Sequence, residues 1–144
     1  MVEEPLLVLR GHPGVGPDVE GEAWVCQDNF SARYDLDRRT GTFSRRSHAC
    51  YGQSLVGRVC FFNGAKGGVS TSWALLDMKS RGVAPAALVF RLTNPVMVQG
   101  AVLADIPLLD RLSPDPLDTV HTGDYVRLRP REGLVEILRR GAGT

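Results

Sequence analysis

The segment from residue 57 to residue 90 restricts the possible fold of this chain more than any other. It has a β-rich apolar run at 57–62, a glycine-rich turn at 64–68, helix-forming residues at 73–81 and a second apolar run at 86–90. Mostly apolar strands are typical of a sheet that is covered on both faces. Two such strands joined through a helix predict a parallel pair with a right-handed crossover. We therefore expect an α/β sheet.

Shorter elements surround this core. Strands are predicted at 6–10, 21–27 and 102–106, and a closing hairpin at 123–128 and 134–138. A second helix is expected from a cap at Thr93 or Asn94 to about Gly100. The polar stretch 29–46, with turn residues at 37–41, indicates a loop with short strands. With 144 residues, the chain is expected to form one barrel-type or layered domain over 1–144, with its core at about 5–139.

Composition excludes several classes of protein. A net charge of +1 argues against nucleic acid or an anionic membrane as the main partner. The apolar runs are too short to span a bilayer, and the first residues do not resemble a signal peptide. The cysteines at 26, 50 and 60 lack the C-x-x-C spacing of a metal or redox site. We expect reduced thiols in a cytoplasmic protein, and no metal in this chain.

One segment carries most of the candidate chemistry: the turn from Lys66 to Ser72, which follows a buried strand and opens a helix. The N-terminus of a helix presents free N–H groups and the positive end of the helix dipole, so it binds anions. Gly67 and Gly68 allow close approach of a ligand to the backbone. The hydroxyls of residues 70, 71 and 72 are candidates for three roles: helix cap, carboxylate ligand, or catalytic base or nucleophile.

A nucleotide-binding role for this turn is rejected. The run from Lys66 to Val69 is similar to the deviant P-loop of ParA-like ATPases, but the second lysine of that loop is missing. Outside the turn, Arg33 is a candidate for binding a carboxylate. His48 is a candidate site residue as well, although a single histidine in a loop is more often structural or solvated.

Along residues 11–138 the chain has a turn at Asp37–Gly41, a segment at His48–Gly57 and a strand at Ala84–Leu88. The order of these motifs resembles that of the small subunit, or swivel domain, of the aconitase X family. Asp37–Gly41 is similar to the family's D-P-x-T-G turn, and His48–Gly57 to its H-P-L-x-G-x-S-L-x-G segment. Ala84–Leu88 matches its A-P-A-A-L strand. Val19–Ala23 resembles its opening strand, and Gly100–Asp110 with Gly123-Asp124 completes the similarity.

The resemblance implies a swivelling β/β/α fold like the mobile domain of aconitase. It implies a hydro-lyase that dehydrates a small hydroxy acid and works only with a large subunit, which carries an iron–sulfur cluster. It also implies that a serine in the turn at the start of the helix is the catalytic base. On this reading the chain itself holds no cofactor, and Lys66, Gly67, Gly68, Thr71, Arg33 and His48 help to bind the substrate.

The chain departs from the family pattern in two places. The family turn usually reads Gly-Ser-Ser or Gly-Ser-Cys, and Gly68 and Val69 stand where those last two residues belong. A later family serine falls on Ser72, which we favour as the base because it keeps the family register. Ser70 would replace the missing base only after a local shift of two residues. Tyr34-Asp35 replaces the usual Gly-Gly before the D-P-x-T-G turn, which favours a substrate different from that of the best-known members.

Two other functions compete with the dehydratase. One is a non-catalytic binding or regulatory swivel domain that has lost the serine, and Gly68-Val69 is its best support. The other is a phosphocarrier that uses His48, because swivelling domains also carry phosphohistidine. No glycine-rich histidine loop of that kind is present, so it is the weaker of the two.

Overall fold

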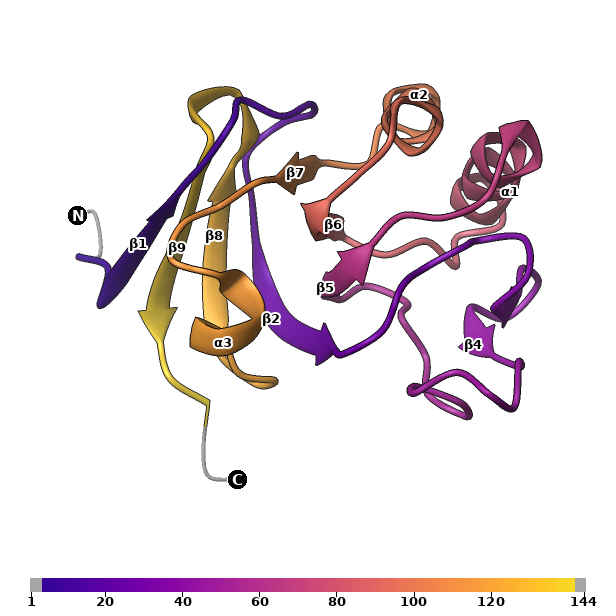
Figure 1. Ribbon diagram of the computed structural model, residues 1–144, viewed down its shortest axis with the longest axis horizontal. Coiled ribbons are helices and arrows are strands. Elements are labelled where there is room, and N and C mark those ends of the chain that lie inside the picture. The colour runs from indigo at the N-terminus through magenta and orange to yellow at the C-terminus, as the bar shows by residue number, and fades with distance from the viewer. Residues whose placement is uncertain (1–3, 142–144) are drawn as a thin grey trace.

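The computed structural model describes residues 4–141, which form one large mixed sheet with helices against it (Figure 1). The sheet has seven strands in the order β1-β9-β8-β2-β5-β6-β7. Pairing is antiparallel from β1 to β2 and parallel from β2 to β7. The expected α/β fold, the parallel core and the closing hairpin are therefore confirmed. The strands are β1 Leu7–Arg10, β2 Val19–Cys26, β5 Val59–Gly64, β6 Ala87–Leu92, β7 Leu108–Asp110, β8 Tyr125–Arg129 and β9 Leu134–Arg139.

The sheet is strongly curled, but residues 4–141 form no closed barrel. No ladder joins its end strands β1 and β7. Two isolated bridges, Arg10 with Ser113 and Val15 with Leu108, link the two ends instead. The swivel-type α/β fold is thus as expected, without the closure that the term barrel implies.

The helices α1 (Val69–Ser80) and α2 (Pro95–Ala104) lie together beside the parallel half of the sheet (Figure 1). Asn94 caps α2 as predicted: its side chain accepts a hydrogen bond from the Met97 N–H at 2.8 Å. Helix α1 begins four residues before the predicted start. The three hydroxyl residues therefore belong to its first turn and do not precede it.

The strand predicted at 102–106 is wrong, because α2 continues to Ala104. The sequence predicts that the helix ends at about Gly100, but this glycine lies inside α2 at the contact with α1. A Cβ atom on Gly100 would lie 2.8 Å from the Cα of Ser72. The glycine thus serves close packing of two helices, and the helix ends instead at Asp105, which adopts φ 55°.

Smaller elements complete the chain. The polar stretch contains the expected short strands, β3 (Leu36–Asp37) and β4 (Thr42–Phe43), and the structure pairs them antiparallel. A short helix, α3 (Pro116–Thr119), follows Asp115. A 3₁₀ turn, Pro130–Glu132, connects β8 with β9. No helix in the described part of the chain is long and apolar enough to cross a membrane.

Alternate residues of the parallel strands pack into two apolar clusters. On β5, Cys60 and Phe62 face the cluster that includes α1 and α2. Val59 and Phe61 face the other cluster, which contains residues of α3, β8 and β9. Both faces of β5 are therefore buried, as its apolar sequence predicted.

The prediction of three reduced thiols is wrong for two of the cysteines. Cys26 at the end of β2 forms a disulfide with Cys50, with 6.4 Å between their Cα atoms. Cys60 is free and buried on β5. The pair is separated by 24 residues, so its spacing in the sequence gave no sign of the bond.

Candidate active site at the start of helix α1

The N-terminus of α1 is not capped by a side chain. Its N-cap residue is Gly68, which has an extended backbone and, within residues 4–141, no side-chain cap bond. Thr71 does not act as the cap; its N–H donates to the Gly68 carbonyl at 2.9 Å. The first N–H groups of a helix have no partner within the helix, so this end is suited to bind an anion.

The three hydroxyls of the first turn have different surroundings. The Ser72 side chain is buried, and its Oγ donates to the Val96 carbonyl of α2 at 2.8 Å. Thr71 is buried as well, with its Oγ1 3.4 Å from the Oγ of Ser31. Ser70 is only half-buried. Of the two candidate bases, Ser72 therefore belongs to the contact between the helices, and Ser70 lies at the accessible side of the turn.

The turn itself is held by the loop that follows β2. The Lys66 N–H donates to the Phe30 carbonyl at 3.0 Å, and the Phe30 N–H donates to Gly64 at 2.9 Å. Gly67 has φ +107°, which favours glycine. A Cβ atom there would also meet the side chain of Thr71 and approach the Ser31 Oγ to 3.0 Å. The close approach of this loop thus explains the glycine at 67.

A buried carboxylate lies beneath the turn. Asp35 is fully buried, and its Oδ2 accepts a hydrogen bond from the Ser31 N–H at 2.8 Å. Its Oδ1 lies 3.4 Å from the Lys66 Nζ and 3.2 Å from an Arg45 guanidinium nitrogen. Asp35 therefore gathers two cationic side chains beside the start of α1.

The other predicted binding residues differ in how close they come to this cluster. His48 is buried, and its Nε2 lies 3.7 Å from the Asp35 Oδ2 and 2.7 Å from the Asn29 carbonyl. Its Nδ1 accepts from the Cys50 N–H, so this network assigns the proton to Nε2. Arg33 is exposed, and its guanidinium lies 5.4 Å from the centre of the Tyr34 ring. The structure thus brings Lys66, the two glycines, Thr71 and His48 together, with Arg33 at the surface.

The cysteines of the described residues do not fit an iron–sulfur cluster. Ligand atoms of Cys26, His48 and Cys50 lie within 4.8 Å of one another, but the two sulfur atoms are bonded to each other. Both ring nitrogens of His48 are engaged by backbone groups. Burial raises the pKa of the Cys60 thiol, which disfavours the thiolate that a metal needs.

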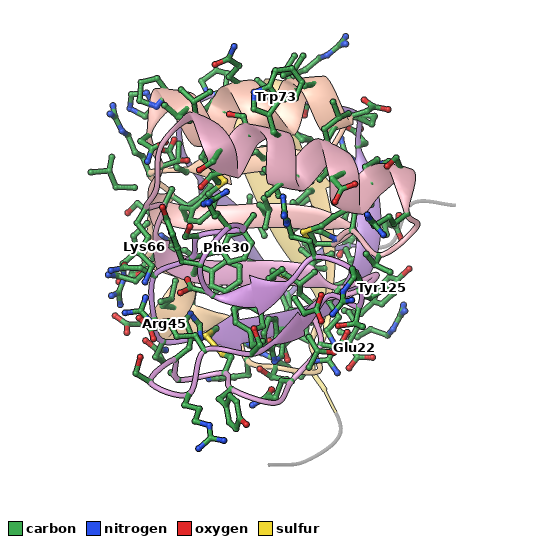
Figure 2. All side chains as sticks on the ribbon, turned by 90° about the vertical axis from the view of Figure 1, so that its right-hand side faces the viewer. Glu22, Phe30, Arg45, Lys66, Trp73 and Tyr125 are labelled. Atoms are coloured by element: carbon green, nitrogen blue, oxygen red, sulfur yellow. A yellow bond between two sulfur atoms is a disulfide. The ribbon has the colours of Figure 1, made fainter. Side chains whose placement is uncertain are left out.

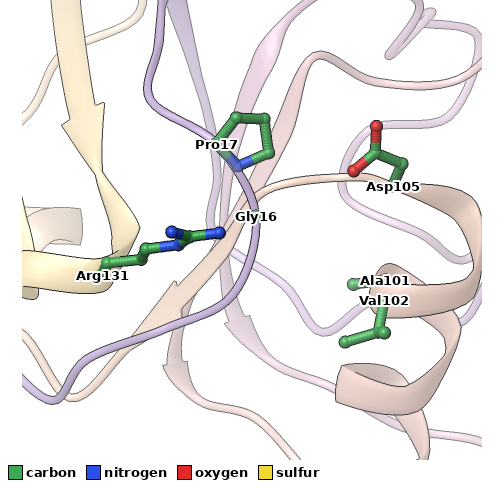
Figure 3. A pocket seen from close by; sticks show the side chains of 6 residues that line it. All are labelled: Gly16, Pro17, Ala101, Val102, Asp105 and Arg131. Atoms are coloured by element: carbon green, nitrogen blue, oxygen red, sulfur yellow. The ribbon is translucent and has the colours of Figure 1, made fainter.

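A concave pocket on the surface lies elsewhere (Figure 3). It is lined by Gly16, Pro17, Ala101, Val102, Asp105 and Arg131. Lys79, near the end of α1, donates to the Asp105 carbonyl at 3.2 Å. The pocket therefore lies at the opposite end of the helix pair from Lys66, and it contains none of the predicted site residues.

Two residues of the cluster were missing from the sequence-based site. Arg45 lies in a run of polar residues that gives no pattern. Asp35 was noted only because it departs from the family's Gly-Gly. A carboxylate in place of the family's glycine, next to the turn at 37–41, was the one available signal. Its role depends on contacts between residues far apart in the chain.

The fold and this site together define a swivel-type α/β subunit that presents an uncapped helix end and a cationic cluster. The chain belongs to the aconitase X family: the family model described as the aconitase X swivel domain matches residues 8–137. It is a hydro-lyase subunit of the dehydratase type, as the resemblance implied.

Similar proteins agree along almost the whole chain. The phosphomevalonate dehydratase small subunit of Methanocella arvoryzae is 34% identical over 90% of this chain and 98% of its own length. The protein of that name from Methanopyrus kandleri is 40% identical, over 83% of this chain and 87% of its own length. The crystal structure of Thermococcus kodakaraensis aconitase X in its holo-form superposes with a TM-score of 0.86 at 29% identity, covering 92% of this chain and 99% of that one.

Proposed function

We propose that this chain is the small subunit of a two-subunit dehydratase whose substrate is phosphomevalonate or a closely similar phosphorylated hydroxy acid. The observation that carries the proposal is the uncapped N-terminus of α1, with Lys66 before it and Ser70 in its first turn. The proteins named phosphomevalonate dehydratase small subunit support the choice of substrate, since they match this chain over most of its length. We follow them and not the different substrate that Tyr34-Asp35 favoured in the sequence.

Dehydration of a hydroxy acid removes a proton from one carbon and a hydroxide from its neighbour, so a base is needed on one side of the substrate. We assign this base to Ser70 and not to Ser72, which the register of the family motif favours. The half-buried hydroxyl of Ser70 makes no hydrogen bond to another described residue, whereas the Ser72 hydroxyl donates a hydrogen bond to the Val96 carbonyl. A serine hydroxyl can accept this proton only after it has lost its own to a base, which we assign to the large subunit. The N–H groups at the start of the helix stabilise the alkoxide that results, and exclusion of water strengthens those hydrogen bonds.

A large subunit is needed to close this site. Val69 and Trp73, on the first two turns of α1, are 65% and 60% exposed. Large apolar side chains beside a polar site are typical of an interface. We assign an iron–sulfur cluster to the large subunit, where it would assist the departure of hydroxide, because the cysteines described above do not fit one. The cytoplasmic location expected from the sequence remains part of the same proposal, but reduced thiols no longer support it, because Cys26 and Cys50 are bonded to each other.

The alternative is a binding or regulatory domain without catalysis. Gly68 and Val69 occupy the two positions where the family usually has hydroxyl or thiol side chains, and this departure favours it. In that case the helix end and Lys66 would bind an anionic ligand without removing a proton.

The test is activity of the assembled pair. The chain is co-expressed with the large subunit encoded nearest to it, purified without oxygen, and supplied with phosphomevalonate and with unphosphorylated hydroxy acids. We expect loss of water from phosphomevalonate, seen as a new alkene signal by proton NMR, and none with either subunit alone. A pair that binds phosphomevalonate and dehydrates no substrate would establish the binding domain instead.

A further inference from the structure

Asp35 is a buried charge whose partners are two partly exposed cations. Its side chain is 0% exposed, whereas the side chains of Lys66 and Arg45 are 36% and 47% exposed. A buried carboxylate must be paired and hydrogen-bonded to be tolerated. The Ser31 N–H supplies a hydrogen bond to one oxygen, and both cations share the other.

Sharing one oxygen brings the two cationic groups close together. A lysine ammonium has three donors and an arginine guanidinium has five, so each retains donors after its contact with Asp35. The three side chains together carry one net positive charge. Figure 2 shows Lys66 and Arg45 on the same side of the molecular face that also presents Trp73.

The loop that carries Asp35 is fixed against the turn before α1. The Asp35 N–H donates to the Ser31 carbonyl at 3.1 Å, and the Ser31 Oγ lies 3.4 Å from the Thr71 Oγ1 in the first turn of the helix. The backbone of residues 44 and 45 is also tied to Asp35, since both N–H groups donate to its carbonyl, at 3.0 and 3.2 Å. Asp35 therefore sets the position of Arg45 as well as that of Lys66.

We propose that Arg45 and Lys66 form a paired binding site for an oxyanion group of the substrate, and that Asp35 is its positioning residue. Arginine binds phosphate and carboxylate through two parallel hydrogen bonds, and lysine adds a point charge. Asp35 holds both groups ready, so that less side-chain freedom is lost when the anion binds. This assignment rests on the proposed function for the identity of the substrate, but not for anion binding as such. It also explains why a carboxylate stands where the family usually has glycine.

The first experiment measures steady-state kinetics of the assembled pair with phosphomevalonate. Asp35→Asn keeps the shape of the side chain and removes its charge, and Arg45→Ala removes one cation. Each is expected to raise KM about tenfold or more, the scale of a lost charged hydrogen bond, while kcat changes less than about twofold. Arg39→Ala is the matched control, because Arg39 forms a similar but exposed pair with Asp37 in the same hairpin region. It should leave KM unchanged.

The second experiment distinguishes the source of the anion and does not need turnover. Inorganic phosphate and acetate are titrated separately into the full-length chain, with binding followed by NMR. Binding of phosphate that is lost in Arg45→Ala and kept in Arg39→Ala supports a phosphate site, and the same pattern with acetate alone supports a carboxylate site. If neither anion binds in a manner that depends on Arg45, or if Asp35→Asn lowers only the thermal midpoint and leaves KM as it was, the proposal is wrong. An inactive pair with Arg45-dependent phosphate binding would overturn the proposed dehydratase but not this site.

Discussion

Gly67 and Gly68 are neighbours with opposite structural requirements. Gly67 has φ +107°, and a Cβ atom at this position would meet the side chains of Thr71 and Ser31. Gly68 has φ −107°, and a Cβ atom there would have no heavy atom within 4 Å outside its chain neighbours. The first position therefore demands glycine, and the second accepts any small residue.

The pair gives a direct prediction for stability. Gly67→Ala should lower the free energy of unfolding by about 1–2 kcal/mol, because alanine disfavours a positive φ. Gly68→Ser should leave the free energy of unfolding unchanged or raise it by about 0.3 kcal/mol, because serine caps a helix slightly better than glycine. Urea unfolding of both variants is the measurement. Equal losses in the two variants would contradict this account of the turn.

At this scale the sequence predicted where the candidate site lies, but not all of the residues that the structure brings to it. The strand, the glycines and the hydroxyls identified the start of a helix as the chemical segment, because those patterns are local. The separation of Ser70 from Ser72 depends on where α2 packs, and the roles of Asp35 and Arg45 depend on a loop that folds back over the turn. Neither contact leaves a pattern in the spacing of residues.

The helices α1 and α2 meet at a glycine. Gly100 allows the α2 backbone to approach Ser72, whose hydroxyl then reaches the Val96 carbonyl. Because glycine was interpreted as a helix end, the sequence predicted a strand at 102–106 where the helix continues. The strands β5 and β6 were predicted to within a few residues, since their apolar runs reflect burial on both faces.

Substitution of Gly100 tests this contact. Gly100→Ala should destabilise the chain by about 1–3 kcal/mol, the usual cost of overpacking, although alanine is the better helix former. Gln99→Ala, at the neighbouring exposed position of α2, is the control and should have little effect. Thermal midpoints of the two variants decide it: a stabilised Gly100→Ala variant would show that the helices are not so closely packed.

The disulfide links parts of the molecule that are distant in sequence. It joins the end of β2 to the loop that carries His48, and the two cysteines are 24 residues apart in the sequence. A bond of this span typically contributes about 3 kcal/mol. A phosphine reductant should lower the thermal midpoint of the wild-type chain and of Cys60→Ala, and should not affect a Cys26→Ser/Cys50→Ser variant. A wild-type midpoint that does not respond, with both thiols free by mass spectrometry, would contradict the bond.

The exposed apolar residues of α1 make a prediction for assembly. Trp73→Glu should weaken binding of the large subunit by about thirtyfold, because a buried tryptophan typically contributes about 2 kcal/mol or more to an interface. Leu103→Glu on α2 is the control: Leu103 is 47% exposed and lies toward the other end of the helix pair. Binding of the separately purified subunits is measured by calorimetry. Equal affinity of the Trp73→Glu variant and the wild type would place the interface elsewhere.

The central claim is that this small domain supplies the base of a shared active site from the first turn of α1. The most direct test compares kcat of complexes that contain Ser70→Ala or Ser72→Ala, with co-elution of the subunits verified for each. We predict that Ser70→Ala reduces kcat by about a hundredfold or more, the scale of a lost proton transfer, with little change in thermal midpoint. Ser72→Ala should instead lower stability by about 1 kcal/mol, because its hydrogen bond to the Val96 carbonyl is lost, and should retain most of kcat. A Ser70→Ala complex with wild-type turnover would contradict the claim.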